Sequence, residues 1–379
     1  MSMFASLFRF LKTFDVIFLF AVIAIALSGL FTMSSFQGND SYFWKQSLWI
    51  AISLGVFSVA SLFEYRFLKQ TRVVMLIYGV LLTVLTLLFT LGYASKGAES
   101  WFRFGGLAFQ PSDLMKLGLI IVLAKYFSRR HIEIANIRHI IISGVYAFIP
   151  FMLVLLQPDF GSAMVLFAIW LGLVFVSGIS IRHLLFVFVM GAVIFSLAWN
   201  FAFKPYQKAR IINFINPLQD IRGTGYNAYQ SVIAVGSGGI LGKGVGYGTQ
   251  SRLSFLPEYK TDFIFAAYAE EWGFVGAMLL LFFFFIIFFK LAWYALVANS
   301  AFEALFTYGV LIWFITHVTI NIGMNIGIMP VTGIPLPLMS YGGSHLLAEC
   351  LALGICVGMR RYSRSGHKYQ MKNEFLGFE

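Results

Sequence analysis

Charged residues are scarce in this chain: Asp, Glu, Lys and Arg make up 11% of its 379 residues. A soluble globular domain carries about a quarter. Cysteine is nearly absent too, because the 2 cysteines, Cys350 and Cys356, both fall in one apolar run near the end. These shortages exclude an ordinary soluble domain and a disulfide-stabilised secreted one.

Apolar residues instead make up 59% of the chain. They recur in runs of about twenty residues, each long enough to cross a hydrocarbon core about 30 Å thick. The sequence therefore predicts an all-α, polytopic integral membrane protein with a single transmembrane domain, 1–379. About ten transmembrane helices are expected, at 15–35, 43–63, 73–93, 112–127, 139–156, 161–177, 183–203, 262–289, 303–325 and 341–359.

Basic residues are unevenly divided between the two sets of short loops. Fifteen lie in one set and three (Lys45, Lys96 and Arg103) in the other. The fifteen are Arg9, Lys12, Arg66, Lys69, Arg72, Arg129, Arg130, Arg138, Arg182, Lys290, Arg360, Arg361, Arg364, Lys368 and Lys372. Because cytoplasmic loops are enriched in Lys and Arg, both termini are expected in the cytoplasm, with 360–379 as a short basic tail. The same bias explains the net charge of +11 without a nucleic-acid partner.

A long polar insert, 204–261, separates the seventh and eighth spans, and by parity it lies outside the cytoplasm. Its basic residues are Lys204, Lys208, Arg210, Arg222, Lys243, Arg252 and Lys260. A basic surface near the lipid headgroups suits an anionic ligand such as a lipid-linked phosphate. Binding and chemistry are therefore expected at this insert.

Asp262 follows the insert and is the first candidate for chemistry. Thr261 is expected to cap the eighth helix, which would place Asp262 in its first turn, above the positive end of the helix dipole. Asp262 could then be a general base or a metal ligand at the membrane boundary, with Glu258 nearby. The alternative is a first-turn acid with only a small effect on stability.

Further candidates lie near the same side of the membrane. Asp113 and Lys116 are at i,i+3 on the fourth span, where they can pair or line a pocket. Asp159 is either a turn acid or an acid beside that pocket. Trp101 and Arg103 are either an interfacial belt with an anchor or a platform for a sugar and a phosphate.

Two pairs of polar residues fall within the predicted spans. Adjacent helical residues diverge by about 100°, so Glu270 and Glu271 are expected to find different partners, in a functional or a structural role. His345 and Glu349 are at i,i+4, which is a weak metal signal, and a structural hydrogen bond is the favoured interpretation.

Five motifs in chain order resemble one family. They are Gln110-Pro111-Ser112-Asp113 with Lys116, Gln157-Pro158-Asp159-Phe160-Gly161, Gly236-Ser237-Gly238-Gly239 with Gly242-Lys243-Gly244, Phe255-Leu256-Pro257-Glu258 followed by Thr261-Asp262-Phe263-Ile264-Phe265-Ala266, and Pro335-Leu336-Pro337-Leu338 with Ser340-Tyr341-Gly342-Gly343-Ser344. Together they resemble the SEDS family of shape, elongation, division and sporulation proteins. Asn321-Ile322-Gly323-Met324 and Gly333-Ile334-Pro335 are more similar to its RodA (elongation) branch than to its FtsW (division) branch.

The resemblance implies a peptidoglycan glycosyltransferase that polymerises lipid II on the outer face of the bacterial cytoplasmic membrane. It also implies a divalent cation, Mg²⁺ or Mn²⁺, and a class B penicillin-binding protein as transpeptidase partner. The family's catalytic aspartate falls on Asp262, which could also hold the metal. The residues expected to bind substrate are Trp101, Arg103, Asp113, Lys116, Asp159, Arg210, Lys243 and Glu258.

Two other functions remain open from the sequence. A flippase that carries lipid II across the bilayer would also need buried acids and a lysine, but through the full depth of the membrane. A polymerase needs them gathered near the outer side, where the candidate residues are predicted. A non-catalytic scaffold that recruits a separate synthase would not require Asp262.

The loop bias generates a test of orientation. A cysteine placed at Gly225 should be labelled by a membrane-impermeant thiol reagent in intact spheroplasts, and one placed at Ile134 should be labelled only after lysis. The reverse pattern would contradict the orientation.

Overall fold

The computed structural model describes residues 15–35, 40–91, 93–95, 98–104, 107–129, 137–201, 203, 205–216, 225–253 and 255–376. Long helices occupy all ten positions predicted from the apolar runs. They are α2 (Val16–Ser34), α3 (Asp40–Leu62), α4 (Thr71–Leu91), α5 (Pro111–Ser128), α6 (Ile137–Leu156), α7 (Phe160–Val176), α8 (Ile181–Phe201), α12 (Ile264–Leu296), α13 (Ala301–Asn325) and α14 (Gly343–Leu376).

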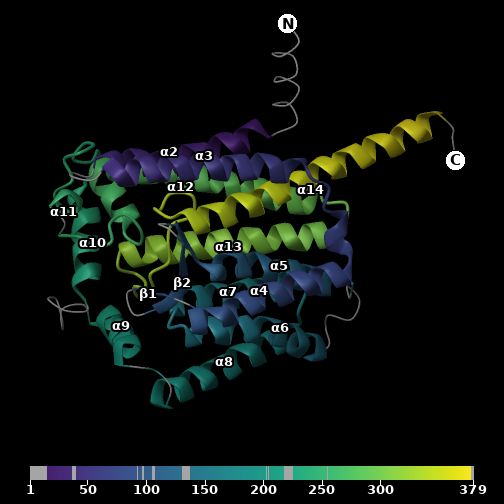
Figure 1. Ribbon diagram of the computed structural model, residues 1–379, viewed down its shortest axis with the longest axis horizontal. Coiled ribbons are helices and arrows are strands. Elements are labelled where there is room, and N and C mark those ends of the chain that lie inside the picture. The colour runs from purple at the N-terminus through teal and green to yellow at the C-terminus, as the bar shows by residue number, and fades with distance from the viewer. Residues whose placement is uncertain are drawn as a thin grey trace, which may run out of the picture.

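These helices lie side by side in one bundle (Figure 1). Seven of them are long and apolar enough to cross a membrane, and α7 is a shorter apolar helix. A bilayer favours helices because every backbone group then finds a partner within its own segment. The polytopic all-α fold is thus confirmed, while the number of ten spans stays a prediction.

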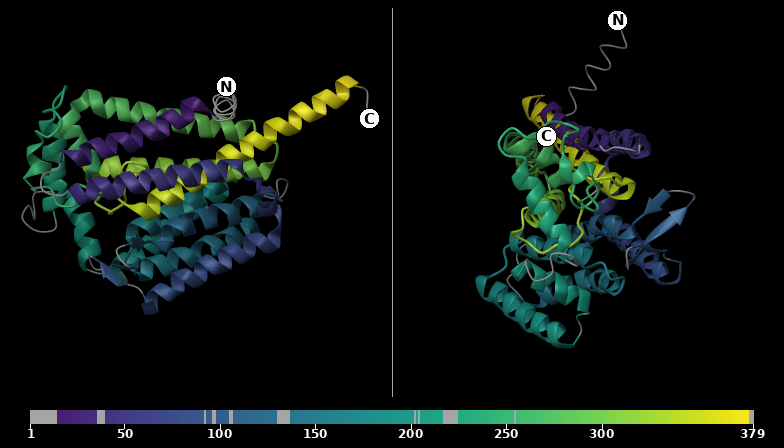
Figure 2. Two further views of the ribbon diagram at one scale, coloured as in Figure 1. Left: turned by 45° about the horizontal axis from the view of Figure 1, so that its top comes forward. Right: turned by 90° about the vertical axis from the view of Figure 1, so that its left-hand side faces the viewer.

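The polar insert gathers at one end of the bundle, called here the insert end. Its helices α9 (Pro205–Ile215), α10 (Tyr226–Ser237) and α11 (Thr249–Arg252) lie at the left of Figure 1. The segment before α5 is not a plain loop, because β1 (Tyr93–Ser95), β2 (Ala98–Phe104) and β3 (Leu107–Phe109) form a small antiparallel sheet in that order. Both views of Figure 2 place this sheet beside the bundle.

At the opposite end, a short 3₁₀ helix (Tyr65–Lys69) joins α3 to α4. Asp15 caps α2 there, and its carboxylate binds Lys290 Nζ at 2.7 Å and the Tyr294 hydroxyl at 3.0 Å, both on α12. The predicted basic tail is helical through Leu376, because α14 continues past the bundle without a break (Figure 1).

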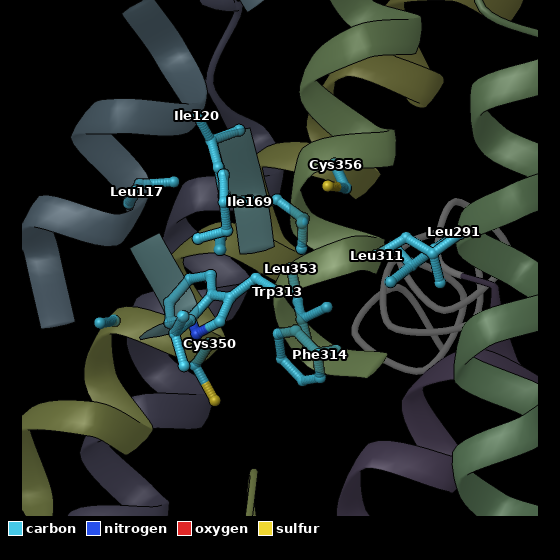
Figure 3. Packing of buried hydrophobic residues seen from close by; sticks show 14 of the residues in the cluster. Leu117, Ile120, Ile169, Leu291, Leu311, Trp313, Phe314, Cys350, Leu353 and Cys356 are labelled. Atoms are coloured by element: carbon cyan, nitrogen blue, oxygen red, sulfur yellow. The ribbon is translucent and has the colours of Figure 1, made fainter. Parts of the chain in front are cut away.

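The core lies between α5, α7, α13 and α14. Trp313 and Phe314 of α13 are 1% exposed. Around them lie Leu117 and Ile120 of α5, Ile169 of α7, and Cys350, Leu353 and Cys356 of α14 (Figure 3). Helix α8 contrasts with this core, since its apolar side chains are mostly exposed at the edge of the bundle. Apolar side chains on that edge are what a lipid environment permits.

Helix α12 is interrupted at Gly273, where φ is +67°. The glycine-rich segment 239–244 of the insert satisfies the peptide groups on both sides of the break. Its bonds are Lys243 N to Glu270 O (3.0 Å), Gly244 N to Glu271 O (3.0 Å), Phe274 N to Gly239 O (2.9 Å) and Val275 N to Ile240 O (3.1 Å). The insert is therefore joined to α12 by backbone hydrogen bonds, which is how a broken helix is tolerated in a membrane protein.

Glycine is required where these two segments meet. A Cβ on Gly273 would lie 2.2 Å from Gly242 N, and one on Gly242 would lie 2.1 Å from Glu271 O. The substitution Gly273→Ala should therefore destabilise the protein by about 1–3 kcal/mol or more, through overpacking and a strained positive φ. The thermal unfolding midpoint in detergent measures this.

Gly55→Ala on α3 is the matched control, because no heavy atom lies within 4 Å of the added Cβ. It should leave the midpoint near that of the parent. Equal midpoints for Gly273→Ala and Gly55→Ala would contradict the close approach at the break.

Candidate active site at the insert end

Asp262 lies in a turn that precedes α12. The prediction that Thr261 caps this helix, with Asp262 in its first turn, is wrong: α12 begins at Ile264, and Phe263 occupies the capping position. The N–H groups of Thr261 and Phe263 both donate to the carbonyl of Glu258, at 3.1 and 3.2 Å. Glu258 adopts a φ of +55° in this turn. The hydroxyl of Thr261 donates to Glu258 Oε2 at 3.0 Å, so it is used within the turn and does not cap α12.

The segment 326–342, between α13 and α14, runs against this turn. Ser340 Oγ donates to the carbonyl of Thr261 at 2.6 Å and accepts the N–H of Leu336 at 2.8 Å. The N–H of Tyr341 donates to the carbonyl of Lys260 at 2.9 Å. These bonds join two irregular segments of backbone that lie about eighty residues apart in the sequence.

The carboxylate of Asp262 is half-buried and lies beside Gly333. A Cβ on Gly333, where φ is +77°, would lie 3.6 Å from Asp262 Oδ2. The start of α7 packs against the same stretch, since a Cβ on Gly161 would lie 2.8 Å from the carbonyl oxygen of Thr332 and 2.9 Å from a side-chain carbon of Ile334. Glycine at both positions lets α7 and Asp262 approach the segment from two sides.

Asp159 connects two of the sequence motifs. Its Oδ1 accepts the N–H of Ser162 at 3.0 Å and so caps α7, while its Oδ2 accepts the amide of Gln110 at 2.8 Å. Asp159 is therefore both a turn acid that caps α7 and a hydrogen-bond partner of the Gln-Pro-Ser motif. Through Gly161, two residues on, this corner also contacts the segment beside Asp262.

Asp113 and Lys116 form a buried ion pair. Both residues are 2% exposed, and Lys116 Nζ lies 2.9 Å from Asp113 Oδ1. Ser344 of α14 donates to Asp113 Oδ2 at 3.1 Å, and the ammonium lies 6.0 Å from the ring centre of Trp313. The pairing predicted from the i,i+3 spacing is confirmed, and it includes a third partner that the sequence did not indicate.

Two further buried side chains, one on α14 and one on α13, bind the 326–342 segment. Glu349 Oε2 accepts the N–H of Leu338 at 2.8 Å, and His317 Nδ1 lies 3.2 Å from the carbonyl oxygen of Pro335. Glu349 thus makes the structural hydrogen bond that the sequence favoured over a metal, although its partner is a backbone amide. The described residues contain no group of three or more His, Cys, Asp and Glu side chains that could hold a metal ion.

Lys260 lies two residues before Asp262 and was not singled out from the sequence as a site residue. Its ammonium lies 3.7 Å from the ring centre of Tyr42 and 5.0 Å from that of Tyr259. Tyr341 packs edge-on against Tyr42. The rings of Tyr42 and Tyr259 hold the ammonium of Lys260 by cation–π attraction.

The acids of α12 have the separate partners that their helical divergence predicts. Glu270 Oε1 accepts Lys243 Nζ at 2.7 Å and the N–H of Thr249 at 2.8 Å. Glu271 Oε1 accepts the N–H of Gly246 at 3.0 Å and the hydroxyl of Ser35. Both carboxylates hold the insert against the bundle, which is a structural role.

The remaining predicted residues are spread over the insert end. Trp101 and Arg103 lie on β2, paired with Tyr93 and Ala108, and the side chain of Arg103 is outside what the structure describes. Arg210 is exposed on α9. Lys204 and Arg222 lie outside the described residues. The substrate-binding role stays a prediction for Trp101, Arg103, Arg210 and Lys243.

Known proteins are similar to this chain in sequence and in fold. Residues 6–365 match the profile of the FtsW/RodA/SpoVE family, described as cell cycle proteins. The chain belongs to this family. The sequence resemblance to SEDS proteins is thereby confirmed over nearly the whole chain.

Three relatives with different names illustrate the similarity. The peptidoglycan glycosyltransferase MrdB of Escherichia coli K12 is 36% identical over 288 residues, which cover 76% of this chain and 78% of MrdB. The stage V sporulation protein E of Bacillus subtilis is 32% identical over 335 residues, covering 87% and 90%. A probable peptidoglycan glycosyltransferase FtsW of Nitrosococcus halophilus is 36% identical, covering 85% and 83%.

Solved structures have the same fold. A chain from a peptidoglycan synthase complex that coordinates polymerization and crosslinking superimposes with a TM-score of 0.80 at 31% identity, covering 92% of this chain and 98% of that one. The rod shape determining protein RodA of Thermus thermophilus gives a TM-score of 0.69 at 30% identity, covering 92% and 97%. The FtsW/RodA/SpoVE fold therefore places this chain among multi-pass membrane proteins.

The Asp113–Lys116 pair generates a stability prediction. Lys116→Met leaves a buried carboxylate without its cation, so it should destabilise the protein by about 3–5 kcal/mol. The double variant Asp113→Leu with Lys116→Met removes both charges and should recover much of this loss. Thermal unfolding of the two variants in detergent tests the prediction, and a double variant less stable than Lys116→Met alone would contradict it.

Proposed function

We propose that this protein is a peptidoglycan glycosyltransferase that polymerises lipid II, with Asp262 as the general base. The observation that carries the proposal is the environment of Asp262. Asp262 is half-buried, and hydrogen bonds anchor its turn to α13 and to the 326–342 segment. Gly333, which has no side chain, lies beside its carboxylate. Relatives named as peptidoglycan glycosyltransferases support the reaction class.

The reaction joins two lipid-linked sugars. The hydroxyl of the acceptor sugar attacks the anomeric carbon of the donor, forming a glycosidic bond while the bond from that carbon to the diphosphate oxygen breaks. Asp262 takes the proton of the attacking hydroxyl, which requires the carboxylate within about 2.6–3.2 Å of that oxygen. The electron pair leaves with the polyprenyl diphosphate, whose lipid chain stays in the membrane.

Cations at the insert end would hold the diphosphate. Lys260 is the described cation nearest to Asp262 in sequence, and the rings of Tyr42 and Tyr259 would hold its ammonium in place for the diphosphate. Asp262 could also hold a divalent cation together with the substrate's phosphates, because Mg²⁺ is commonly bound by one or two protein carboxylates plus phosphate oxygens. Such a cation would neutralise charge that develops on the leaving diphosphate.

The membrane setting and the partner are part of the same proposal. We place the insert end on the outer face of the bacterial cytoplasmic membrane, with both termini inside, on the evidence of the loop charges. A solved relative belongs to a complex that coordinates polymerization with crosslinking. That supports a class B penicillin-binding protein as the transpeptidase partner of this chain.

A flippase is less well supported. The polar groups around Asp262, Asp159 and Asp113 lie at the insert end, at or before the first turns of α12, α7 and α5. Beyond Lys116, which lies 6.0 Å from the ring centre of Trp313, the core toward the opposite end is formed mainly by apolar side chains such as Leu311 and Leu353 (Figure 3). A passage for a charged headgroup would need polar groups through that depth.

Asp262→Asn provides the direct test on purified protein with lipid II as substrate. The substitution keeps size and hydrogen bonding but removes the basic oxygen, so kcat should fall about 10²–10⁴-fold while KM changes little. Glycan chain formation, followed by gel electrophoresis of labelled product, measures the rate.

Parent-level polymerisation by Asp262→Asn would overturn the proposed role. Activity that is lost in this variant but restored by a different divalent ion would identify Asp262 as a metal ligand instead. A lipid II translocation assay on the same variant separates the flippase, which predicts loss of transport, from the polymerase, which does not.

A further inference from the structure

Two asparagines of α13 bind the peptide group of Asp262. Asn321 and Asn325 lie one helical turn apart, and both are 0% exposed. Asn321 Nδ2 donates to the carbonyl oxygen of Asp262 at 2.9 Å and to that of Ile334 at 2.8 Å. Asn325 Nδ2 donates to the same Asp262 oxygen at 3.1 Å. A carbonyl oxygen has two lone pairs, and both are thus matched by side-chain amides from one helix.

Asn325 also performs the capping that Thr261 does not. Its Oδ1 accepts the N–H of Ala266 at 3.1 Å, in the first turn of α12. That N–H is one of the first four in a helix, which have no partner within the helix itself. The carbonyl of Asp262 and the amide of Ala266 are therefore bound by one side chain from a neighbouring helix.

These bonds act on Asp262 itself. Its carbonyl belongs to the same residue as the carboxylate, so the amides fix the plane from which the side chain projects. The second bond of Asn321, to Ile334, fixes the stretch that includes Gly333, beside Asp262 Oδ2. Rotation of the Asp262 peptide group would move the carboxylate relative to a bound hydroxyl. A displacement of about 1 Å can lower the rate about 10²-fold.

We propose that Asn321 and Asn325 are positioning residues for the glycosyl transfer: they set the orientation of the Asp262 carboxylate through its peptide group. This inference rests on the proposed role of Asp262. Neither asparagine touches substrate, so their loss should lower turnover and leave substrate affinity in place.

Asn321→Leu is the principal variant, because leucine has the same number and branching of side-chain heavy atoms but neither donors nor an acceptor. On lipid II, kcat should fall about 10- to 100-fold while KM stays within about threefold of the parent. Thr307→Val is the matched control: it removes a buried hydroxyl of the same helix, which donates to the carbonyl of Glu303 at 2.8 Å and lies fourteen residues before Asn321. Its kcat should stay within about twofold of the parent.

The inference is overturned if Asn321→Leu keeps the parent kcat, if its loss lies in KM alone, or if Thr307→Val loses as much kcat. Should Asn321→Leu fail to fold in detergent, Asn321→Ser, with its shorter donor, takes its place with the same expected split between kcat and KM. A parent-like kcat in Asn321→Ser would then overturn the inference.

Asp262→Asn in the same assay separates this inference from the proposed function. An inactive Asp262→Asn beside a fully active Asn321→Leu overturns the positioning role alone. A fully active Asp262→Asn overturns the general-base role, and the positioning role with it.

Discussion

The peptide groups of residues 260–262 and 334–342 lie in irregular backbone packed among long apolar helices. In a bilayer such groups have no water to bind, and each unsatisfied one costs several kcal/mol. Here buried side chains supply the partners. Gln46 of α3 donates to the carbonyl of Ser340 and accepts the N–H of Gly342, Asn321 and Asn325 bind from α13, and Glu349 binds from α14. The turn that carries Asp262 depends on these polar residues, each placed on a helix that is otherwise apolar.

The same constraint explains how the insert is held. Helix α12 is joined to the insert at two places. At the start of α12, Asn325 of α13 binds both Ala266 of α12 and Ser231 of the insert. At Gly273, the glycine-rich segment 239–244 binds the backbone of α12 directly. Glu270 and Glu271 reinforce the second contact by binding backbone amides of the insert. The insert is therefore fixed to the helices that carry Asp262 rather than being an independent domain. If Asp262 is the general base proposed here, holding it in this way would reduce the reorganisation needed when substrate binds.

Much of this architecture could be predicted from sequence, and for a physical reason. In a bilayer an apolar run forms a helix because a helix satisfies its own backbone hydrogen bonds. The ten helix positions could therefore be predicted from hydropathy. Helical geometry alone gave the pairing of Asp113 with Lys116 and the divergence of Glu270 and Glu271. What failed was a local capping rule: Thr261 has the right chemistry for a cap, but a turn closed on Glu258 uses it, and Asn325, distant in sequence, takes over.

Other features depend on contacts that no local pattern reveals. The small sheet of β1, β2 and β3 and the break at Gly273 arise from packing between segments. The ammonium of Lys260 is held over the ring of Tyr42, which lies more than two hundred residues earlier in the chain. Asn321 appeared in the sequence only within a family motif, and Asn325 was not singled out. An asparagine in an apolar span gives no indication of which carbonyl it binds.

One measurement tests the central claim most directly: a structure of this protein with a lipid-linked donor and an acceptor sugar bound. The general-base role of Asp262 predicts the acceptor hydroxyl within about 3.2 Å of its carboxylate, directly or through one bound cation. The diphosphate should then lie toward Lys260. A reacting centre beside the Asp113–Lys116 pair, with Asp262 out of reach of the acceptor, would contradict the claim.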